Sequence, residues 1–290
     1  MILVVGATGL LGAKITRRLL QQSKPVRILT RAGSPAAELS AAGAQAVTGD
    51  LKDRPSLDAA VAGVDAVVTT ANSILRGGAD TVESVDRDGN RNLIEAAAGA
   101  GVRHFVFTSL LGADAGSPVP FMRAKGESEA LLRTSGMAWT VLAPNLFMDV
   151  WIPMVVGAPA MAGDPVTVVG GGNRQHSLVA AEDVAAYAVA AIERREAEGQ
   201  TLIIGGPEAV SYRDIAATFE RQLGRPVPVQ TVAAGEPVPG LPAAMSPLLA
   251  FQDTYDSPID MTELAAVYGV APTSVEDFVR GFLAAQSPAG

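Results

Sequence analysis

The first twelve residues, MILVVGATGLLG (Met1 to Gly12), decide the fold. A short apolar run is followed at once by a G-x-x-G-x-x-G turn, and an amphipathic helical pattern over residues 10–22 continues from it. Glycine lets the backbone turn tightly and approach a pyrophosphate, and a helix N-terminus presents unpaired N–H groups to an anion. The order of strand, turn and helix therefore predicts a dinucleotide site, with a positive φ expected at Gly9. Its residues are Gly6, Ala7, Thr8, Gly9, Leu10, Leu11 and Gly12.

Short β-branched runs alternate with helical patterns along most of the chain. The expected strands are residues 2–5, 26–30, 45–47, 66–69, 104–108, 139–142 and 202–204. The expected helices are residues 10–22, 92–100, 121–134, 181–195 and 275–285. Such alternation is typical of βαβ units. It predicts an α/β fold with a Rossmann-type, doubly wound parallel sheet.

Two stretches interrupt this regularity, and they suggest a second lobe. Residues 145–175 are rich in Gly, Pro and Met, and residues 207–272 are rich in proline. We interpret them as a smaller substrate-binding lobe inserted beyond the sheet edge. The expected division is residues 1–150 with 176–206 for the nucleotide-binding domain and 151–175 with 207–272 for the lobe. Residues 273–290 are expected to form a C-terminal helix that packs back.

Composition excludes several classes of function. The chain has 290 residues and a net charge of −8, which disfavours nucleic acid and anionic membranes as partners. It has no cysteine and two histidines, so we expect no metal site. No apolar run approaches the ~20 residues of a membrane span, and the N-terminus is a strand pattern without a basic leader. We expect a cytoplasmic protein that takes a small-molecule substrate, as a monomer or homodimer.

The end of the second expected strand indicates which nucleotide binds. Proteins that prefer NAD carry Asp or Glu there, where it binds the ribose 2′-hydroxyl. This strand ends Thr30-Arg31, and no carboxylate precedes Glu38. A guanidinium pairs well with a 2′-phosphate, so we predict NADP(H) as cofactor, held by Thr30 and Arg31 with help from Ser34. The alternative is that Arg31 is an ordinary solvated arginine.

Several segments, in this order and spacing, resemble the NmrA-like branch of the atypical short-chain dehydrogenases/reductases. They are Gly6-Ala7-Thr8-Gly9, Gly49-Asp50-Leu51, Asp88-Gly89-Asn90-Arg91-Asn92-Leu93, Gly101-Val102-Arg103-His104-Phe105-Val106, Thr108-Ser109 and Glu182-Asp183-Val184-Ala185. The branch includes quinone reductases, isoflavone-reductase-type enzymes and cofactor-sensing regulators. The resemblance covers most of the first 190 residues.

The resemblance implies further cofactor contacts. Asp50 and Leu51 would lie beside the adenine, and Thr70-Ala71-Asn72 would follow the ribose and phosphates. Pro144 and Asn145 would line the nicotinamide end. For Asn72, ordinary turn chemistry at the end of a strand is the alternative.

The chain departs from the family at the Tyr-x-x-x-Lys pair, in which the lysine lowers the pKa of a proton-donating phenol. Here the segment is Phe121-Met-Arg-Ala-Lys125, and none of the four tyrosines stands four residues before a lysine. Lys125 keeps its place, so we expect it to bind the nicotinamide ribose and to act in catalysis with Ser109. The alternatives are a solvated helix lysine and a serine that caps its strand.

The resemblance also implies where the substrate binds. Phe121, Phe147, Met148 and Trp151 are apolar and adaptable enough to form a wall against an aromatic compound, with core packing as the alternative. His176 follows a glycine-rich loop and would reach the cleft as a proton donor; a surface histidine is the alternative.

Two functions compete at this point. The first is an NADPH-dependent oxidoreductase that transfers hydride to a ketone, quinone or conjugated double bond of a flat apolar small molecule, aromatic or polyketide-like, without the usual catalytic tyrosine. The second is a non-catalytic NADP(H)-sensing regulator, since regulators of this branch have also lost the tyrosine. A sugar-nucleotide epimerase is disfavoured because those relatives need the tyrosine.

Overall fold

A computed structural model describes residues 1–74, 76–242 and 245–286. The strands are β1 (Ile2–Val5), β2 (Val26–Thr30), β3 (Gln45–Thr48), β4 (Ala66–Thr69), β5 (His104–Thr108), β6 (Ala138–Pro144), β7 (Val166–Val169), β8 (Gln200–Ile204) and β9 (Val229–Val232). The α-helices are α1 (Leu10–Gln21), α2 (Ala37–Ala41), α3 (Arg54–Val61), α4 (Asp88–Gly99), α5 (Pro120–Arg133), α6 (Met148–Trp151), α7 (Ala158–Ala162), α8 (Ala181–Glu193), α9 (Tyr212–Leu223), α10 (Ser246–Gln252), α11 (Thr262–Tyr268) and α12 (Val275–Gln286). Two π-helical turns, η1 (Val82–Arg87) and η2 (Ile152–Gly157), and a 3-10 turn, η3 (Arg195–Ala197), complete the set in the described ranges.

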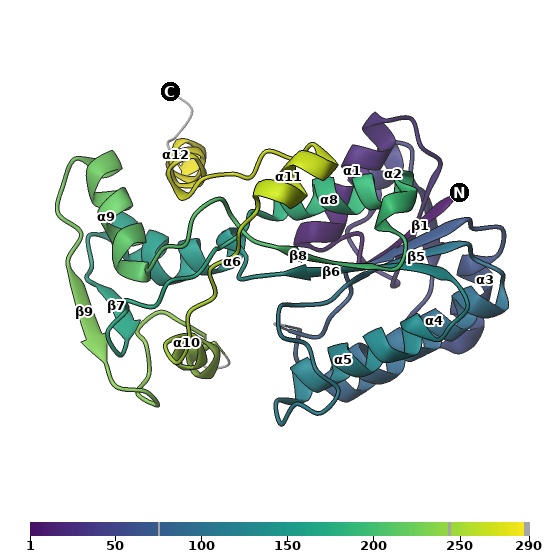
Figure 1. The fold of residues 1–290 in the computed structure, drawn as a ribbon, viewed down its shortest axis with the longest axis horizontal. Coiled ribbons are helices and arrows are strands. Elements are labelled where there is room, and N and C mark those ends of the chain that lie inside the picture. Colours follow the sequence, from purple (N-terminus) through teal and green to yellow (C-terminus); the bar gives the residue numbers. More distant parts are fainter. Residues whose placement is uncertain (75, 243–244, 287–290) are drawn as a thin grey trace. The chain divides into compact units, whose positions relative to one another are not determined.

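The main sheet has the strand order β3-β2-β1-β4-β5-β6-β8. The pairs from β3 to β6 are parallel, and β1 pairs with both β2 and β4, so that Val4 lies between Ile28 and Val68. The chain order reverses between β1 and β4, which is the switch point where such sheets bind ligands at the carboxyl ends of their strands. Helices α1 and α8 cover one face, and α3, α4 and α5 cover the other (Figure 1). The predicted α/β, doubly wound architecture is confirmed.

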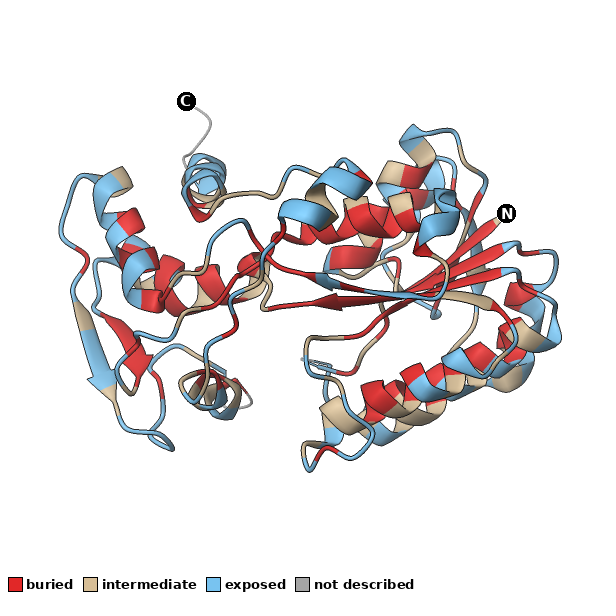
Figure 2. Ribbon diagram, viewed as in Figure 1, coloured by how far each residue is buried: buried red, intermediate tan, exposed pale blue. Residues whose placement is uncertain are grey.

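Burial explains why these segments become strands and helices. Every residue of β1, β4 and β5 is buried, as expected for strands covered by helices on both faces. Figure 2 shows these strands in red beneath partly exposed helices. On α1 the buried residues Leu11, Ile15 and Leu19 recur at helical spacing, which turns one face toward the sheet.

The chain folds into two compact units, and their bounds differ from the expected division. Unit 1 comprises Met1–Pro144 with Val184–Ile203, and unit 2 comprises Asn145–Asp183 with Ile204–Gly290. Residues 145–150 fall in unit 2 because Met148 is buried in its core. Residues 176–183 follow for a similar reason, since His176 forms backbone bridges with Val210 and Ser257.

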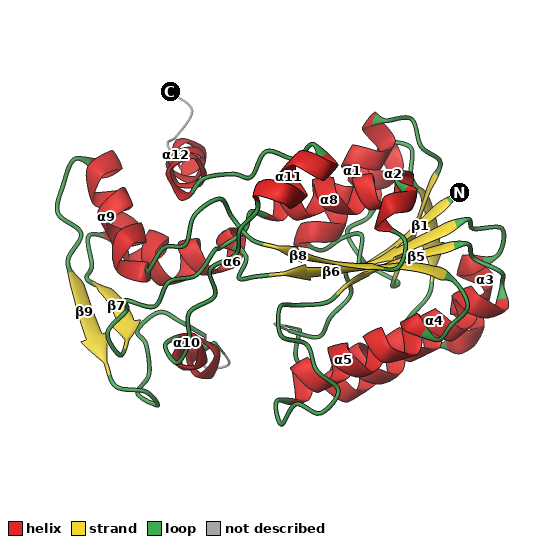
Figure 3. Ribbon diagram, viewed as in Figure 1, coloured by secondary structure: helices red, strands yellow, loops and turns green. Residues whose placement is uncertain are grey.

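Unit 2 contains the parallel pair β7 and β9, which the sequence patterns did not predict (Figure 3). Helix α12 packs against α9, where the Phe219 and Phe282 rings meet edge to face with centroids 5.9 Å apart. The described part of the expected C-terminal segment thus packs within unit 2, and residues 287–290 lie outside the described residues.

Among the described residues no helix is both long and apolar enough to cross a bilayer. The same ranges hold no group of three or more His, Cys, Asp or Glu side chains arranged for a metal ion.

Candidate functional site

The glycine turn joins β1 to α1 in a conformation that excludes side chains. Gly6 has a φ of 82°, and the Gly9 N–H donates to the Gly6 carbonyl oxygen over 3.0 Å. A Cβ on Gly6 would lie 2.7 Å from the Thr70 hydroxyl oxygen, and a Cβ on Gly12 would overlap the Gly6 carbonyl. Both positions are therefore closed to larger residues.

The expected positive φ at Gly9 is wrong. Gly9 is the N-cap residue of α1, with φ −84° and ψ 172°, and N-cap residues adopt extended backbone. The left-handed residue of the turn is Gly6. At Gly9 a Cβ would lie 3.3 Å from the Gly6 carbonyl oxygen, so the limit there is space.

The N-terminus of α1 lacks the usual internal partners. Gly9 has no side chain to cap it, and the first turn contains no acidic residue. The first N–H groups and the positive end of the helix dipole are therefore available to an anion. Leu10 begins the helix and is 45% exposed, whereas Ala7 and Leu11 pack inward.

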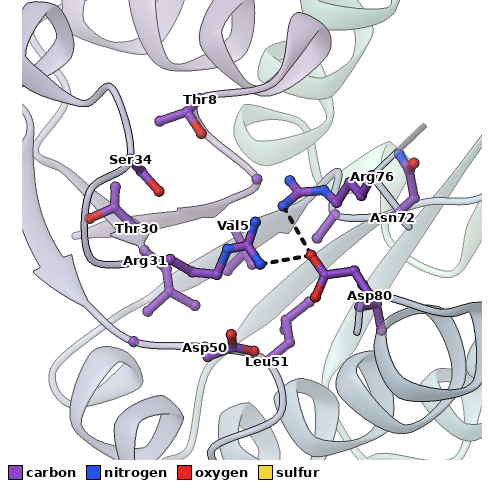
Figure 4. A pocket seen from close by; sticks show the side chains of 15 residues that line it. Val5, Thr8, Thr30, Arg31, Ser34, Asp50, Leu51, Asn72, Arg76 and Asp80 are labelled. Carbon is purple, nitrogen blue, oxygen red and sulfur yellow. Dashed lines mark hydrogen bonds and ion pairs between the residues drawn. The ribbon is translucent and has the colours of Figure 1, made fainter. Parts of the chain in front are cut away.

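A pocket opens beside this turn, at the carboxyl ends of β1, β2 and β4 (Figure 4). Predicted residues that line it are Gly6, Thr8, Thr30, Arg31, Ser34, Asp50, Leu51, Ala71 and Asn72. The structure thus brings together residues from four separate stretches of the first 72, all in unit 1.

Several of these residues also have internal partners. Asp50 accepts from the Lys52 backbone N–H over 2.9 Å, and Leu51 is buried. Asn72 accepts from the Ile74 N–H over 3.1 Å, which is the turn chemistry named above as the alternative. Thr70 bonds the β1 backbone through its N–H, 2.9 Å from the Val5 carbonyl oxygen. Asn72 therefore lines the pocket and stabilises a turn at once.

The pocket contains a cluster of charges that the sequence patterns did not reveal. Asp80 lies 2.7 Å from an Arg31 guanidinium nitrogen and 2.6 Å from the Lys52 ammonium, and Arg76 approaches to 3.8 Å. Figure 4 shows the carboxylate of Asp80 between the guanidinium groups of Arg31 and Arg76. Hydrogen bonds from Lys52 and then Arg31 lower the pKa of Asp80, so its carboxylate is ionised at neutral pH.

A second group of charged side chains in unit 1 surrounds Lys125. It is 3% exposed, and its ammonium donates to the Thr108 carbonyl oxygen over 2.9 Å. The ammonium also lies 4.9 Å from the Phe107 ring centroid and 5.6 Å from that of half-buried Phe121. Burial lowers the pKa of Lys125, and the nearby carboxylates of Asp86 and Glu129 oppose that shift. The solvated-lysine alternative is wrong.

Ser109 and two buried carboxylates complete this region. The Ser109 hydroxyl donates to a Glu129 carboxylate oxygen over 2.5 Å, and the other oxygen of Glu129 accepts from Arg133 over 2.8 Å. Asp86 accepts from the N–H and hydroxyl of Ser73, and burial raises the pKa of Asp86. Neither carboxylate belongs to a recognisable motif. Their spacing from Lys125 becomes significant only once α5 and η1 pack together.

Within unit 2 the predicted wall residues are mostly interior. Met148 is fully buried and Trp151 is 7% exposed, both in the core that also holds Ile215 and Phe219. The core-packing alternative therefore describes these two residues. Phe147, at the N-cap of α6, is partly exposed.

His176 is buried, so the surface-histidine alternative is wrong, and its surroundings do not favour the predicted role of proton donor. It is 2% exposed, and its two ring nitrogens lie 2.8 Å from the Ser257 hydroxyl and 3.2 Å from the Gln252 carbonyl oxygen. Burial lowers its pKa, so it is neutral at pH 7 and a poor proton donor. The Asn145 amide also donates to Ser257, over 3.0 Å to the hydroxyl and 3.1 Å to the carbonyl oxygen. Pro144, one residue earlier, ends β6 in unit 1.

The residues of the unit 1 pocket fit a dinucleotide. The glycine turn lines the pocket through Gly6 and Thr8, and the first turn of α1 has no side-chain cap for its N–H groups. The cations at the ends of β2 and β3 suit an additional phosphate.

Comparisons with known proteins agree with this reading. The NmrA-like family profile matches residues 1–270. The NAD(P)H azoreductase of Xenophilus azovorans is 37% identical over 227 residues, which cover 78% of this chain and 75% of that protein. The (4-alkanoyl-5-oxo-2,5-dihydrofuran-3-yl)methyl phosphate reductase of Streptomyces griseus is 35% identical over 251 residues, covering 86% and 81%. The crystal structure of an NADPH-dependent quinone oxidoreductase from Escherichia coli in complex with NADPH superposes with a TM-score of 0.81 at 25% identity, covering 98% of this chain and all of that one. The resemblance seen in the motifs is thus confirmed, and the chain belongs to the NmrA-like family.

Proposed function

We propose that this protein is an NADPH-dependent reductase that transfers hydride to a ketone, quinone or conjugated double bond of a flat apolar small molecule. The observation that carries the proposal is the unit 1 pocket, in which an uncapped glycine turn and a basic strand end face the same opening. Three relatives whose names describe reductases support it.

The sheet order supports a single cofactor that reaches from the glycine turn to Ser109. Neighbouring strands lie ~4.8 Å apart, and β5 is two strands from β1. The glycine turn and the end of β5 are therefore ~10 Å apart across the carboxyl edge. That separation suits a dinucleotide whose pyrophosphate rests on α1 and whose nicotinamide lies near Ser109 and Lys125.

In this proposal Arg31 and Thr30 bind the 2′-phosphate, and Asp50 and Leu51 flank the adenine. Thr70, Ala71 and Asn72 follow the ribose and phosphates, with Pro144 and Asn145 at the nicotinamide end. Phe121 contributes apolar surface for the acceptor.

Reduction of a carbonyl or quinone adds a hydride and a proton to the acceptor. NADPH supplies the hydride when bound. The ammonium of Lys125 supplies the proton, because burial lowers its pKa and Phe121 has none to give. Glu129 accepts the hydrogen of the Ser109 hydroxyl, so the Ser109 oxygen remains as an acceptor for an N–H or O–H group of the bound cofactor or substrate. Solvent then returns a proton to the Lys125 amine.

The test is NADPH oxidation followed by absorbance across a panel of quinones, azo compounds, aromatic ketones and enones, with acceptor-free protein as the blank. We expect turnover with at least one of these classes. Tight NADPH binding without oxidation by any acceptor would contradict the proposal and favour the NADP(H)-sensing alternative.

A further inference from the structure

The carboxylate of Asp80 lies among three cations at the pocket, Arg31, Lys52 and Arg76. Its two oxygens are divided between two donors, Oδ1 toward the Lys52 ammonium and Oδ2 toward the Arg31 guanidinium. Arg76 faces the same Oδ2 from 3.8 Å, too far for a hydrogen bond. The Asp80 side chain is only 10% exposed, so these partners largely enclose it.

The cluster keeps an excess of positive charge. Arg31, Lys52 and Arg76 carry three positive charges, whereas Asp80 and the more distant Asp50, 3.9 Å from Lys52, carry two negative ones. The Asp80 carboxylate therefore accepts hydrogen bonds from Arg31 and Lys52, and it accepts none from Arg76. A phosphate dianion has twice the charge and three terminal oxygens, enough to bond all three.

We propose that Asp80 is an internal stand-in for the nucleotide's 2′-phosphate, which displaces it from Arg31, Lys52 and Arg76. This rests on the proposed NADP(H) binding and adds a specificity-determining role for residues that carry no family motif. The Asp80 carboxylate keeps the three cations gathered before the nucleotide binds, and it competes with the phosphate for them. The 2′-hydroxyl of a nucleotide without this phosphate is neutral, so it cannot replace the carboxylate as the cations' partner.

The backbone around Asp80 is compatible with such an exchange. Asp80 follows two left-handed glycines, Gly77 (φ 71°) and Gly78 (φ 64°), and its N–H donates to the Gly77 carbonyl oxygen over 3.3 Å. A Cβ on either glycine would meet open space. The backbone just before Asp80 therefore has open space beside both glycines.

The experiment measures dissociation constants of two nucleotides that contain no nicotinamide, 2′,5′-ADP and 5′-AMP, by calorimetry on the full chain. Asp80→Asn removes the competing charge and keeps the shape. We expect it to tighten 2′,5′-ADP about tenfold and to leave 5′-AMP within about twofold. Asp58→Asn is the matched control, because it removes one negative charge from an exposed ion pair with Arg54 outside the pocket.

A second variant tests the cradle independently of how Asp80→Asn folds. Lys52→Met keeps the length of the side chain and removes the charge, so 2′,5′-ADP should bind about tenfold more weakly while 5′-AMP is unchanged. Thermal unfolding of each variant checks that unit 1 remains folded.

Each other result overturns the inference in an identifiable way. Weaker 2′,5′-ADP binding in Asp80→Asn would mean that the carboxylate only scaffolds the cations, and weaker 5′-AMP binding would mean that it binds the ribose. Unchanged affinities would mean that the cluster lies apart from the phosphate. Because the readout needs no turnover, a failure to reduce any acceptor would count against the proposed reductase alone. If the unmodified chain binds NADPH but not 2′,5′-ADP, only the stand-in role falls.

Discussion

Arg31 is the residue on which the choice between the two nicotinamide cofactors depends. It follows β2, lines the pocket and faces Asp80, and no carboxylate stands at this strand end. We expect NADPH to bind at least tenfold more tightly than NADH, a difference of ~1.4 kcal/mol. Arg31→Glu should abolish this preference. Calorimetry with both nucleotides checks it.

The matched control is Arg17→Glu, which makes the same charge change in an exposed pair with Glu38, outside the pocket lining. It should leave the NADPH preference intact. Equal dissociation constants for NADPH and NADH in the unmodified protein would show that Arg31 does not read the 2′-phosphate.

Lys125 is the residue that should limit turnover. Its ammonium is buried against Phe107 and Thr108, in a region where charge is poorly solvated. Lys125→Ala and Lys125→Met should each lower kcat on the order of a hundredfold, ~2.7 kcal/mol of barrier. The methionine variant keeps the length and isolates the charge. Lys24→Ala, in a surface pair with Glu193, is the control.

The pH profile gives a second readout for Lys125. Burial lowers its pKa from the usual 10.5, so the ammonium loses its proton at a lower pH than a free lysine. If that proton reaches the acceptor, kcat should fall as pH rises, with a midpoint below 10.5. A flat profile together with near-normal turnover of both variants would identify another proton source, and the acceptor's own hydroxyl would be tested next by methylation.

Single residues show most clearly what the sequence could not predict. Arg31 and Lys125 were found because they stand at fixed places relative to a strand end and a family motif. Asp80 was missed because its partners Arg31 and Lys52 are 49 and 28 residues away. Glu129 was missed because an acidic residue on a helix is usually solvated, and only packing shows that this one is buried beside Ser109.

At the scale of elements, the βαβ pattern predicted the main sheet well. The seven expected strand runs all lie within the seven strands of that sheet. The signal is strongest for β1, β4 and β5, which are buried throughout and therefore nearly continuously apolar, whereas β3 and β8 are largely exposed. β7 and β9 were missed because prolines stand close to both, at Pro165 and Pro228, and their short runs resemble loop sequence. Within the described ranges the two strands pair only with each other, so no neighbouring repeat signals them.

The turn between β1 and α1 gives a prediction that belongs to these two elements. Gly9→Val places a branched side chain at the N-cap, over the N–H groups that α1 presents. NADPH affinity should be lost while the fold persists, since Gly9 is not left-handed. Gly99→Ala, at the end of α4 with open space around its Cβ, is the control. Full NADPH affinity in Gly9→Val, measured by calorimetry, would show that the pyrophosphate rests elsewhere.

The pairing of β5 with β6 gives a pH prediction. His104 is 1% exposed and lies 2.9 Å from the Thr140 hydroxyl, and burial lowers its pKa below the usual 6.5. Below pH 6.5 the His104 ring is protonated in the unfolded chain but remains neutral in the folded chain, so the free energy of unfolding decreases as the pH falls. Between pH 7.5 and 5.5 this costs up to about 1.4 kcal/mol. The His104→Gln variant should lose correspondingly less free energy of unfolding over the same pH range.

The two tryptophans make this measurable in one unit. Trp139 belongs to unit 1 and Trp151 to unit 2, so urea unfolding in a Trp151→Phe background reports Trp139 alone. If His104→Gln loses as much stability on acidification as the parent, His104 is already protonated in the fold.

At the scale of the whole molecule, the charges of the pocket oppose those of the chain. The net charge of −8 repels a phosphorylated nucleotide, yet Arg31, Lys52 and Arg76 meet at one opening. Repulsion by the distant charges is weakened by salt beyond ~8 Å, whereas the enclosed cluster acts at contact. The protein therefore binds an anion through local arrangement despite its overall charge.

The division into two units predicts which residues exchange their amide hydrogens more slowly when each half of the cofactor binds. Every residue that lines the pocket belongs to unit 1. A ligand that binds only the folded chain makes local unfolding of its binding site less favourable, and amide hydrogens in that site therefore exchange more slowly.

With 2′,5′-ADP, hydrogen exchange should slow in residues 6–12, 29–34, 49–52 and 71–74, and residues 145–183 should be unchanged. With NADPH, additional protection should appear around Ser109 and Lys125. If 2′,5′-ADP alone protects residues 145–183 as strongly as the glycine turn, then nucleotide binding involves unit 2 from the start, and the assignment of the adenosine half to unit 1 alone is wrong.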